Sequence, residues 1–185
     1  MVAAAVGFGI LELGLRAAGF APWGNAPLPY VPLMQEPDPK LGWRNLSGRY
    51  VFGNSEAIEM TFWPGGLRAT GPEPLARERQ VLVLGGSFTQ GWAVSDAETY
   101  AYRLQEAFPG VEVRNLGTAG YGTLQALLSL ERALEAAPRA PALVLYGFND
   151  FHDTRNVATA QWLRMLSRVS QLGTVRTPYA SLDAD

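Results

Sequence analysis

The sequence predicts an α/β fold, namely a three-layer α/β/α domain with a parallel, flavodoxin-like sheet. A small β-hairpin segment and an N-terminal apolar helix precede this domain. From residue 80 onward, short apolar runs alternate with helical segments, and each run leads into a glycine-containing loop. Such βα units join parallel strands through right-handed crossovers, so the carboxyl ends of the three predicted strands share one edge of the sheet. With only three predicted strands, we expect the sheet to be incomplete at the C-terminus.

The composition is that of an ordinary globular domain and excludes several classes of site. The chain has 185 residues, of which 48% are hydrophobic and 17% charged, with a net charge of −2. This charge gives no reason to expect nucleic acid as a partner, because phosphate binding requires clustered Lys and Arg. There are no cysteines and only one histidine, which excludes disulfides, thiolate metal sites and sites with two imidazoles. We therefore predict neither a cofactor nor a metal site.

Residues 1–21 are predicted to form an apolar helix, interrupted by Glu12 and Arg16. The uninterrupted apolar run, residues 2–11, is about half of the ~20 residues needed to cross a bilayer. Two interpretations remain: a helix that packs on the domain, or the end of a longer membrane helix. The length of the run slightly favours the second interpretation. Membrane association and a location in the cell envelope are therefore expectations.

A Pro-rich extended linker is predicted for residues 22–48, and a small β segment for residues 49–79. Six of the 13 prolines lie between residues 22 and 39, a density that excludes helix and central strand. After the linker, two runs with alternating apolar residues flank a turn at Gly53-Asn54, which predicts a β-hairpin. The main domain is predicted to span residues 80–185.

Within this domain, local signals place the strands and helices in order. Ser95 and Glu98 form a capping box that predicts a helix start, and Pro109-Gly110 ends that helix. Thr123 is suited to cap the next helix. The predicted strands are 81–84, 111–116 and 142–148, and the predicted helices run from Ser95 to Phe108, from Thr123 to before Pro138, and from about Val157 to Leu172.

The loops that follow the three strands carry the most informative residues. They read GGSFTQG at 85–91, NLGTAGYG at 115–122 and GFND at 147–150. Ser87 lies at a strand-to-helix turn, where its hydroxyl is exposed near the positive end of a helix dipole. Gly120 and Asn149 would supply a backbone N–H and a side-chain amide toward the same point. Donors aimed at one oxygen form an oxyanion hole, as acyl transfer requires. The competing interpretation of Ser87 is a simple helix N-cap.

The three loops together resemble blocks I, II and III of the SGNH (GDSL-like) hydrolases and acyltransferases, over residues 80 to about 150. The resemblance implies that Ser87 is the nucleophile and that Ser87 N–H, Gly120 N–H and the Asn149 amide form the oxyanion hole. It implies a serine esterase-type hydrolase that cleaves carboxylic esters of small molecules or carbohydrates through an acyl-enzyme. An O-acyltransferase that modifies a cell-envelope polysaccharide would use the same residues.

Two departures from the family pattern concern the chemistry. Gly86 stands where the family usually has Asp, and the Asp-x-x-His block near the C-terminus is absent. A serine hydroxyl is a weak nucleophile until a base takes its proton. Three explanations are open: the base lies beyond Asp185 in a longer protein, His152 is the base, or the chain binds a ligand without turnover. We favour the first, because a three-stranded open sheet would leave an apolar edge exposed.

Two functions of other classes compete with the esterase. A nucleotide-binding module would use residues 85–91 as a phosphate cradle at a helix N-terminus. Against this function, the sequence has no Gly-x-Gly-x-x-Gly motif, and the loop has no Lys. A non-catalytic envelope or carbohydrate-binding protein with the same fold would bind ligand without using Ser87 as a nucleophile.

Overall fold

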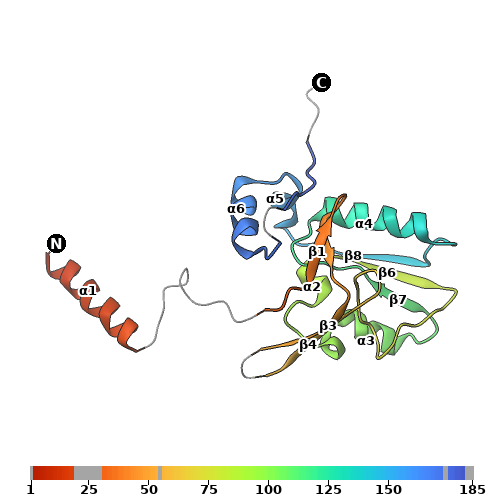
Figure 1. Cartoon of the computed structure of the whole chain (residues 1–185), viewed down its shortest axis with the longest axis horizontal. Coiled ribbons are helices and arrows are strands. Elements are labelled where there is room, and N and C mark those ends of the chain that lie inside the picture. Colours follow the sequence, from red (N-terminus) through yellow and green to blue (C-terminus); the bar gives the residue numbers. More distant parts are fainter. Residues whose placement is uncertain (1, 19–30, 54–55, 173–174, 182–185) are drawn as a thin grey trace. The chain divides into compact units, whose positions relative to one another are not determined.

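The computed structural model describes residues 2–18, 31–53, 56–172 and 175–181 (Figure 1). The chain divides into two units, Met1–Val31 and Pro32–Asp185. The first contains helix α1 (Val2–Ala17), on which Arg16 Nε donates to Glu12 Oε1 at 2.7 Å. Among the residues described, none of the helices has the length and apolar character needed to cross a membrane. These helices therefore give the expectation of membrane association no support.

The second unit is built on a six-stranded sheet in the order β3-β4-β5-β7-β6-β8. Strand β6 (Gln80–Gly85) pairs in parallel with β7 (Glu112–Asn115) on one side and with β8 (Leu143–Gly147) on the other. The three parallel strands predicted from the apolar runs are thus confirmed. Because they run in one direction, the loops that follow them emerge at the same edge of the sheet.

Helices cover both faces of the parallel part of the sheet. Val83 of β6 packs with Ala101 of α3 (Tyr100–Ala107), whereas the next residue, Leu84, packs against α4 (Thr123–Ala136). Successive strand side chains point to opposite faces, so a fully apolar strand needs a helix on each side. Figure 1 shows α3 and α4 on the two sides of the sheet, which confirms the three-layer α/β/α arrangement.

The predicted hairpin is present, but it belongs to the main sheet. Strands β3 (Gly48–Phe52) and β4 (Ile58–Trp63) pair antiparallel. Strand β5 (Leu67–Arg68) pairs with β4 and, through Arg68 opposite Asn115, with β7. The sheet is therefore mixed rather than purely parallel as predicted, because the antiparallel strands add to its β7 edge.

The structure also differs from the predicted Pro-rich linker. Residues 19–30 lie outside the described part, but strands β1 (Gln35–Asp38) and β2 (Gly42–Asn45) form a two-stranded antiparallel sheet, here called the β1–β2 hairpin. Pro37 is accommodated because each strand of a two-stranded sheet is an edge strand. Trp43 is buried in a core cluster with Tyr121 and Trp162, so this segment packs on the main domain instead of spanning away from it.

Helix starts differ from the prediction at two places. The Ser95–Glu98 capping box is present, but it caps a 3₁₀ turn (Asp96–Glu98), and α3 begins only after Thr99. The last predicted helix is divided into α5 (His152–Asn156) and α6 (Ala160–Val169). In both cases a threonine at the N-cap, Thr99 or Thr159, accepts a hydrogen bond from the helix backbone and fixes the start.

Candidate active site

The loops after the three parallel strands meet around Gly86, directly before Ser87. Ser87 is the first residue of the short helix α2 (Ser87–Gln90), and Gly86 is its N-cap. An ideal Cβ on Gly86 would lie 3.1 Å from the Tyr121 carbonyl oxygen and 3.1 Å from His152 Nε2. Tyr121 follows Gly120 in the chain, and the His152 N–H donates to the Asn149 carbonyl at 3.0 Å. The turn before Ser87 thus lies close to Tyr121, which follows Gly120, and to His152, which binds the Asn149 carbonyl.

Three polar groups on these loops have no hydrogen-bond partner in the described structure. Within the described ranges, no hydrogen bond engages the backbone N–H of Ser87, the backbone N–H of Gly120 or the side-chain amide of Asn149. Gly120 has φ +90°, a conformation that glycine adopts without strain. Ser87 Oγ also has no hydrogen-bond partner among the described side chains. Each of the three loops therefore carries a donor without a partner, and no hydrogen bond joins the Ser87 hydroxyl to a base.

The only histidine lies buried beside this serine turn. His152 is 0% exposed, and its Nδ1 lies 2.8 Å from Tyr146 Oη. The Tyr146 hydroxyl also donates to Thr123 Oγ1 at 2.7 Å. The contact of Asn149 N with Nδ1, at 3.4 Å, is the weaker one. His152 Nε2 has no hydrogen-bond partner in the described structure and lies beside Gly86.

Burial is the first cause that lowers the pKa of His152, and the nearby Arg155 cation is the second. The imidazole is consequently neutral near pH 7 and able to accept a proton. His152 is a buried residue at the start of α5, and not the exposed loop residue that its acidic neighbours suggest. No hydrogen bond joins Nε2 to Ser87 Oγ.

Two neighbouring side chains explain why glycine, and not the aspartate usual in the family, stands at position 86. An ideal Cβ on Gly86 would lie 3.3 Å from Arg155 Nη1 and 3.1 Å from His152 Nε2. The Arg155 guanidinium is held over the rings of Phe151 and Trp162, at 4.3 and 4.6 Å, and Nη1 donates to the Tyr121 carbonyl at 2.8 Å. The space of an aspartate side chain at this position is thus taken by an imidazole and a guanidinium.

A buried polar network fixes the loop after β7 to α2. Asn115 is fully buried; its Nδ2 donates to the Thr89 carbonyl at 2.8 Å, and its Oδ1 accepts the Gly117 N–H at 2.9 Å. Asn45 of β2 donates to the Gly117 carbonyl at 3.0 Å. Since buried polar groups without partners are costly, these bonds restrict the positions of the site loops.

Arg68 extends this network, and the sequence analysis missed it. Its side chain is fully buried; Nε donates to the Gln90 carbonyl at 3.0 Å, Nη2 donates to the Val94 carbonyl at 2.9 Å, and Nη1 pairs with Asp96. Burial lowers the pKa of Arg68 to about 10, so the guanidinium stays charged at neutral pH. Arg68 lies on a two-residue strand with no motif, and nothing local in the sequence indicates its role.

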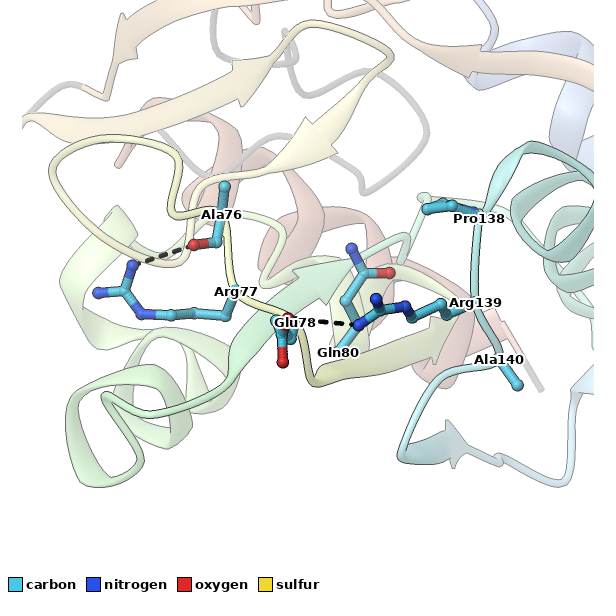
Figure 2. Close-up of a pocket in the computed structure, with 7 residues that line it drawn as sticks. All are labelled: Ala76, Arg77, Glu78, Gln80, Pro138, Arg139 and Ala140. Atoms are coloured by element: carbon cyan, nitrogen blue, oxygen red, sulfur yellow. Dashed lines mark hydrogen bonds and ion pairs between the residues drawn. The ribbon is translucent and has the colours of Figure 1, made fainter.

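A surface cavity of about 460 Å³ lies elsewhere on the domain (Figure 2). It includes Gln80, at the amino end of β6, whereas Ser87 follows the carboxyl end. Figure 2 shows Arg139 beside Glu78, an exposed ion pair of 3.4 Å. The cavity is thus remote from the serine. In the part of the chain that is described, no group of three or more His, Asp or Glu side chains is arranged to hold a metal ion.

Comparison with known proteins identifies the family of the chain. The GDSL-like lipase/acylhydrolase family matches residues 83–182. Among solved structures, the chain is similar to AlinE4, an SGNH-hydrolase family esterase, with 23% identity and a TM-score of 0.35; the match covers 51% of this chain and 56% of AlinE4. Two AlinE4 mutants match with 22% and 20% identity, TM-scores of 0.38 and 0.37 and the same coverage. No curated protein matches the chain. Because the family match spans more than half of its residues, the chain belongs to the GDSL-like lipase/acylhydrolase family.

Proposed function

We propose that this protein is a serine esterase-type hydrolase that cleaves carboxylic esters through an acyl-enzyme on Ser87. One observation supports the proposal above the others. Ser87, Gly120 and Asn149 lie in the loops after β6, β7 and β8, and no hydrogen bond of the described structure engages the N–H of Ser87, the N–H of Gly120 or the amide of Asn149. A member of a hydrolase family with this set of donors is suited to stabilise a negative oxygen.

In the proposed reaction, Ser87 Oγ attacks the ester carbonyl carbon and gives its proton to a base. The carbonyl oxygen becomes negative and accepts hydrogen bonds from Ser87 N–H, Gly120 N–H and Asn149 Nδ2. The C–O bond to the alcohol breaks, and the alcohol leaves with the proton from the base. Water then attacks the acyl-enzyme, and the acid product leaves. Removing a single donor of this kind typically costs about 10²–10³ in rate.

We propose His152 as the base, supported by its Nε2, which lies beside Gly86 and has no hydrogen-bond partner in the described structure. Tyr146 would hold the Nδ1–H and keep the ring in this orientation, the task that a carboxylate performs in a Ser-His-Asp triad. Hydrogen bonds to the nucleophile are often long before a substrate binds, so the missing contact with Ser87 Oγ is compatible with the assignment.

The substrate is proposed to be an ester of a small molecule or a carbohydrate. An O-acyltransferase would differ only in the last step, where a sugar hydroxyl replaces water as the acceptor. We also propose membrane association and a cell-envelope location, which rest on the apolar run at residues 2–11.

The test compares the full chain with two serine variants in the hydrolysis of p-nitrophenyl acetate. Ser87→Ala should lower the enzymatic rate at least 10²-fold. Ser167→Ala is the matched control, because Ser167 is an exposed serine on α6 whose hydroxyl donates only to the Arg164 carbonyl. Equal rates for wild type and Ser87→Ala would refute the nucleophile. A fluorophosphonate probe that fails to label Ser87, in a protein that still binds esters, would instead indicate a non-catalytic binding protein.

A further inference from the structure

We propose that Trp43 and Gln35, on the β1–β2 hairpin, are positioning residues that orient the Gly120 N–H of the oxyanion hole. Both lie outside the family match, which begins at residue 83. The inference rests on the proposed function, and it adds a second part of the chain to the site.

Both side chains bind the same carbonyl group, that of Ala119. Trp43 Nε1 donates to the Ala119 oxygen at 2.9 Å, and Gln35 Nε2 donates to it at 3.2 Å. This carbonyl belongs to the peptide unit that carries the Gly120 N–H. A trans peptide is planar, and its C=O and N–H point in opposite directions. No cis peptide occurs in the described ranges, so fixing the Ala119 oxygen toward the hairpin directs the Gly120 N–H away from it.

The loop that contains this peptide contacts the serine turn on both sides of it. The Thr118 N–H donates to the Gly85 carbonyl at 3.1 Å, and the Tyr121 carbonyl approaches Gly86. The residues on either side of the Ala119–Gly120 peptide thus contact the β6–α2 turn. The Gly120 N–H itself is free of partners in the described structure, as a donor reserved for a ligand would be.

The two hydrogen bonds oppose a flip of this peptide. A flip would turn the Ala119 oxygen toward the site and the N–H toward the hairpin, which would replace a donor by a repelling acceptor. Glycine by itself allows such rotation, since Gly120 lacks a side chain. The Trp43 ring also lies close to Gly120, because an ideal Cβ on Gly120 would lie only 2.8 Å from Trp43 Cζ2. Hydrogen bonds to the carbonyl also polarise the peptide and strengthen its N–H as a donor.

The hairpin is fixed firmly enough to perform this role. Asp38 pairs with both terminal nitrogens of Arg132, at 2.7 and 2.9 Å. Gln125 Nε2 donates to the Leu41 carbonyl at 2.7 Å, which ties the hairpin to α4. Trp43 is 2% exposed, and its carbonyl accepts the Tyr121 hydroxyl. The donors to Ala119 are therefore held on a rigid support.

The test uses Trp43→Phe, which keeps an aromatic ring but removes the N–H, and Gln35→Met, which removes the second donor. With p-nitrophenyl acetate, Trp43→Phe should lower kcat about 5- to 30-fold with KM nearly unchanged, less than the loss of the oxyanion donor itself. The double variant should lose more than either single variant. Trp162→Phe is one control, because Trp162 packs beside Gly120 and its Nε1 has no partner among the described residues. Because Trp162 also supports the Arg155 guanidinium beside Gly86, Trp162→Phe reports on packing at the site, and Trp63→Phe on β4 (Ile58–Trp63) is the variant that should retain the wild-type kcat.

A second measurement does not depend on turnover. The ¹³C resonance of the Ala119 carbonyl should move upfield in Trp43→Phe and again in the double variant, but not in Trp63→Phe. If kcat stays at the wild-type value in the double variant while the resonance moves, the positioning role is refuted. An unmoved resonance would refute the hydrogen bonds themselves. If wild type and Ser87→Ala hydrolyse the ester equally, the proposed function fails, and the resonance alone decides whether the hairpin orients this peptide.

Discussion

Replacing Asp38 with Asn should destabilise the protein at neutral pH, and this effect should fade in acid. Asp38 is 7% exposed and accepts four hydrogen bonds, two from Arg132 and two from the backbone N–H groups of Lys40 and Leu41. The hydrogen bond from Arg132 is the largest cause that lowers the pKa of Asp38, from 3.8 to about 2. One pKa unit corresponds to about 1.4 kcal/mol, so ionised Asp38 contributes about 2 kcal/mol to the free energy of unfolding.

The sign of the pH dependence follows from the lowered pKa. The unfolded chain takes up the proton at the higher pKa, so the contribution is fully present above about pH 4–5. It is lost as the pH falls from about 4 to about 2. The free energy of unfolding of Asp38→Asn should thus lie about 2 kcal/mol below that of wild type at pH 7 and approach it near pH 2.5.

Urea unfolding followed by tryptophan fluorescence, at several pH values between 7 and 2.5, measures this difference. Glu36→Gln is the matched control, since Glu36 forms an exposed pair with Arg44 on the same hairpin and should have a much smaller effect. A destabilisation by Asp38→Asn that is equally large at pH 2.5 and pH 7 would contradict the reasoning. So would an effect at pH 7 no larger than that of the control.

Two further predictions concern the site. Burial and Arg155 lower the pKa of His152, so the acidic limb of the kcat/KM–pH profile should have its midpoint below pH 6.5. His152→Gln should lose this limb, and its rate should fall about 10²- to 10⁴-fold. An unchanged profile in a folded variant would assign the base elsewhere. Gly120→Ala should lower the free energy of unfolding by about 1–3 kcal/mol, because alanine is strained at φ +90° and its Cβ would contact the Trp43 ring. A urea unfolding midpoint equal to that of wild type would contradict this conformation of Gly120.

Local patterns were sufficient to predict the parallel strands and the loops that carry the site. The apolar run in β6 marks a strand covered on both faces, and helices do pack on both. Ser87, Gly120 and Asn149 were placed at one sheet edge because parallel strands share that edge. The capping residue Ser95 was also found from its spacing to Glu98. Each of these inferences depends on residues close together in the chain.

The parts that were missed depend on contacts between distant residues. The Pro-rich segment contains a hairpin whose Trp43 binds a carbonyl 76 residues away, and the mixed sheet arises where Arg68 pairs with Asn115. His152 is buried because Tyr146 and the site loops enclose it, although its acidic neighbours suggest an exposed loop.

The sequence by itself determined the alternation of strand and helix, the family and the residues that form the serine loop, because these depend on periodicity and short motifs. Only the tertiary structure decided that Arg68 and the β1–β2 hairpin bind the loops that follow β6 and β7. The physical reason is that a buried donor is satisfied by whichever acceptor the fold brings near it, and no local pattern contains that information.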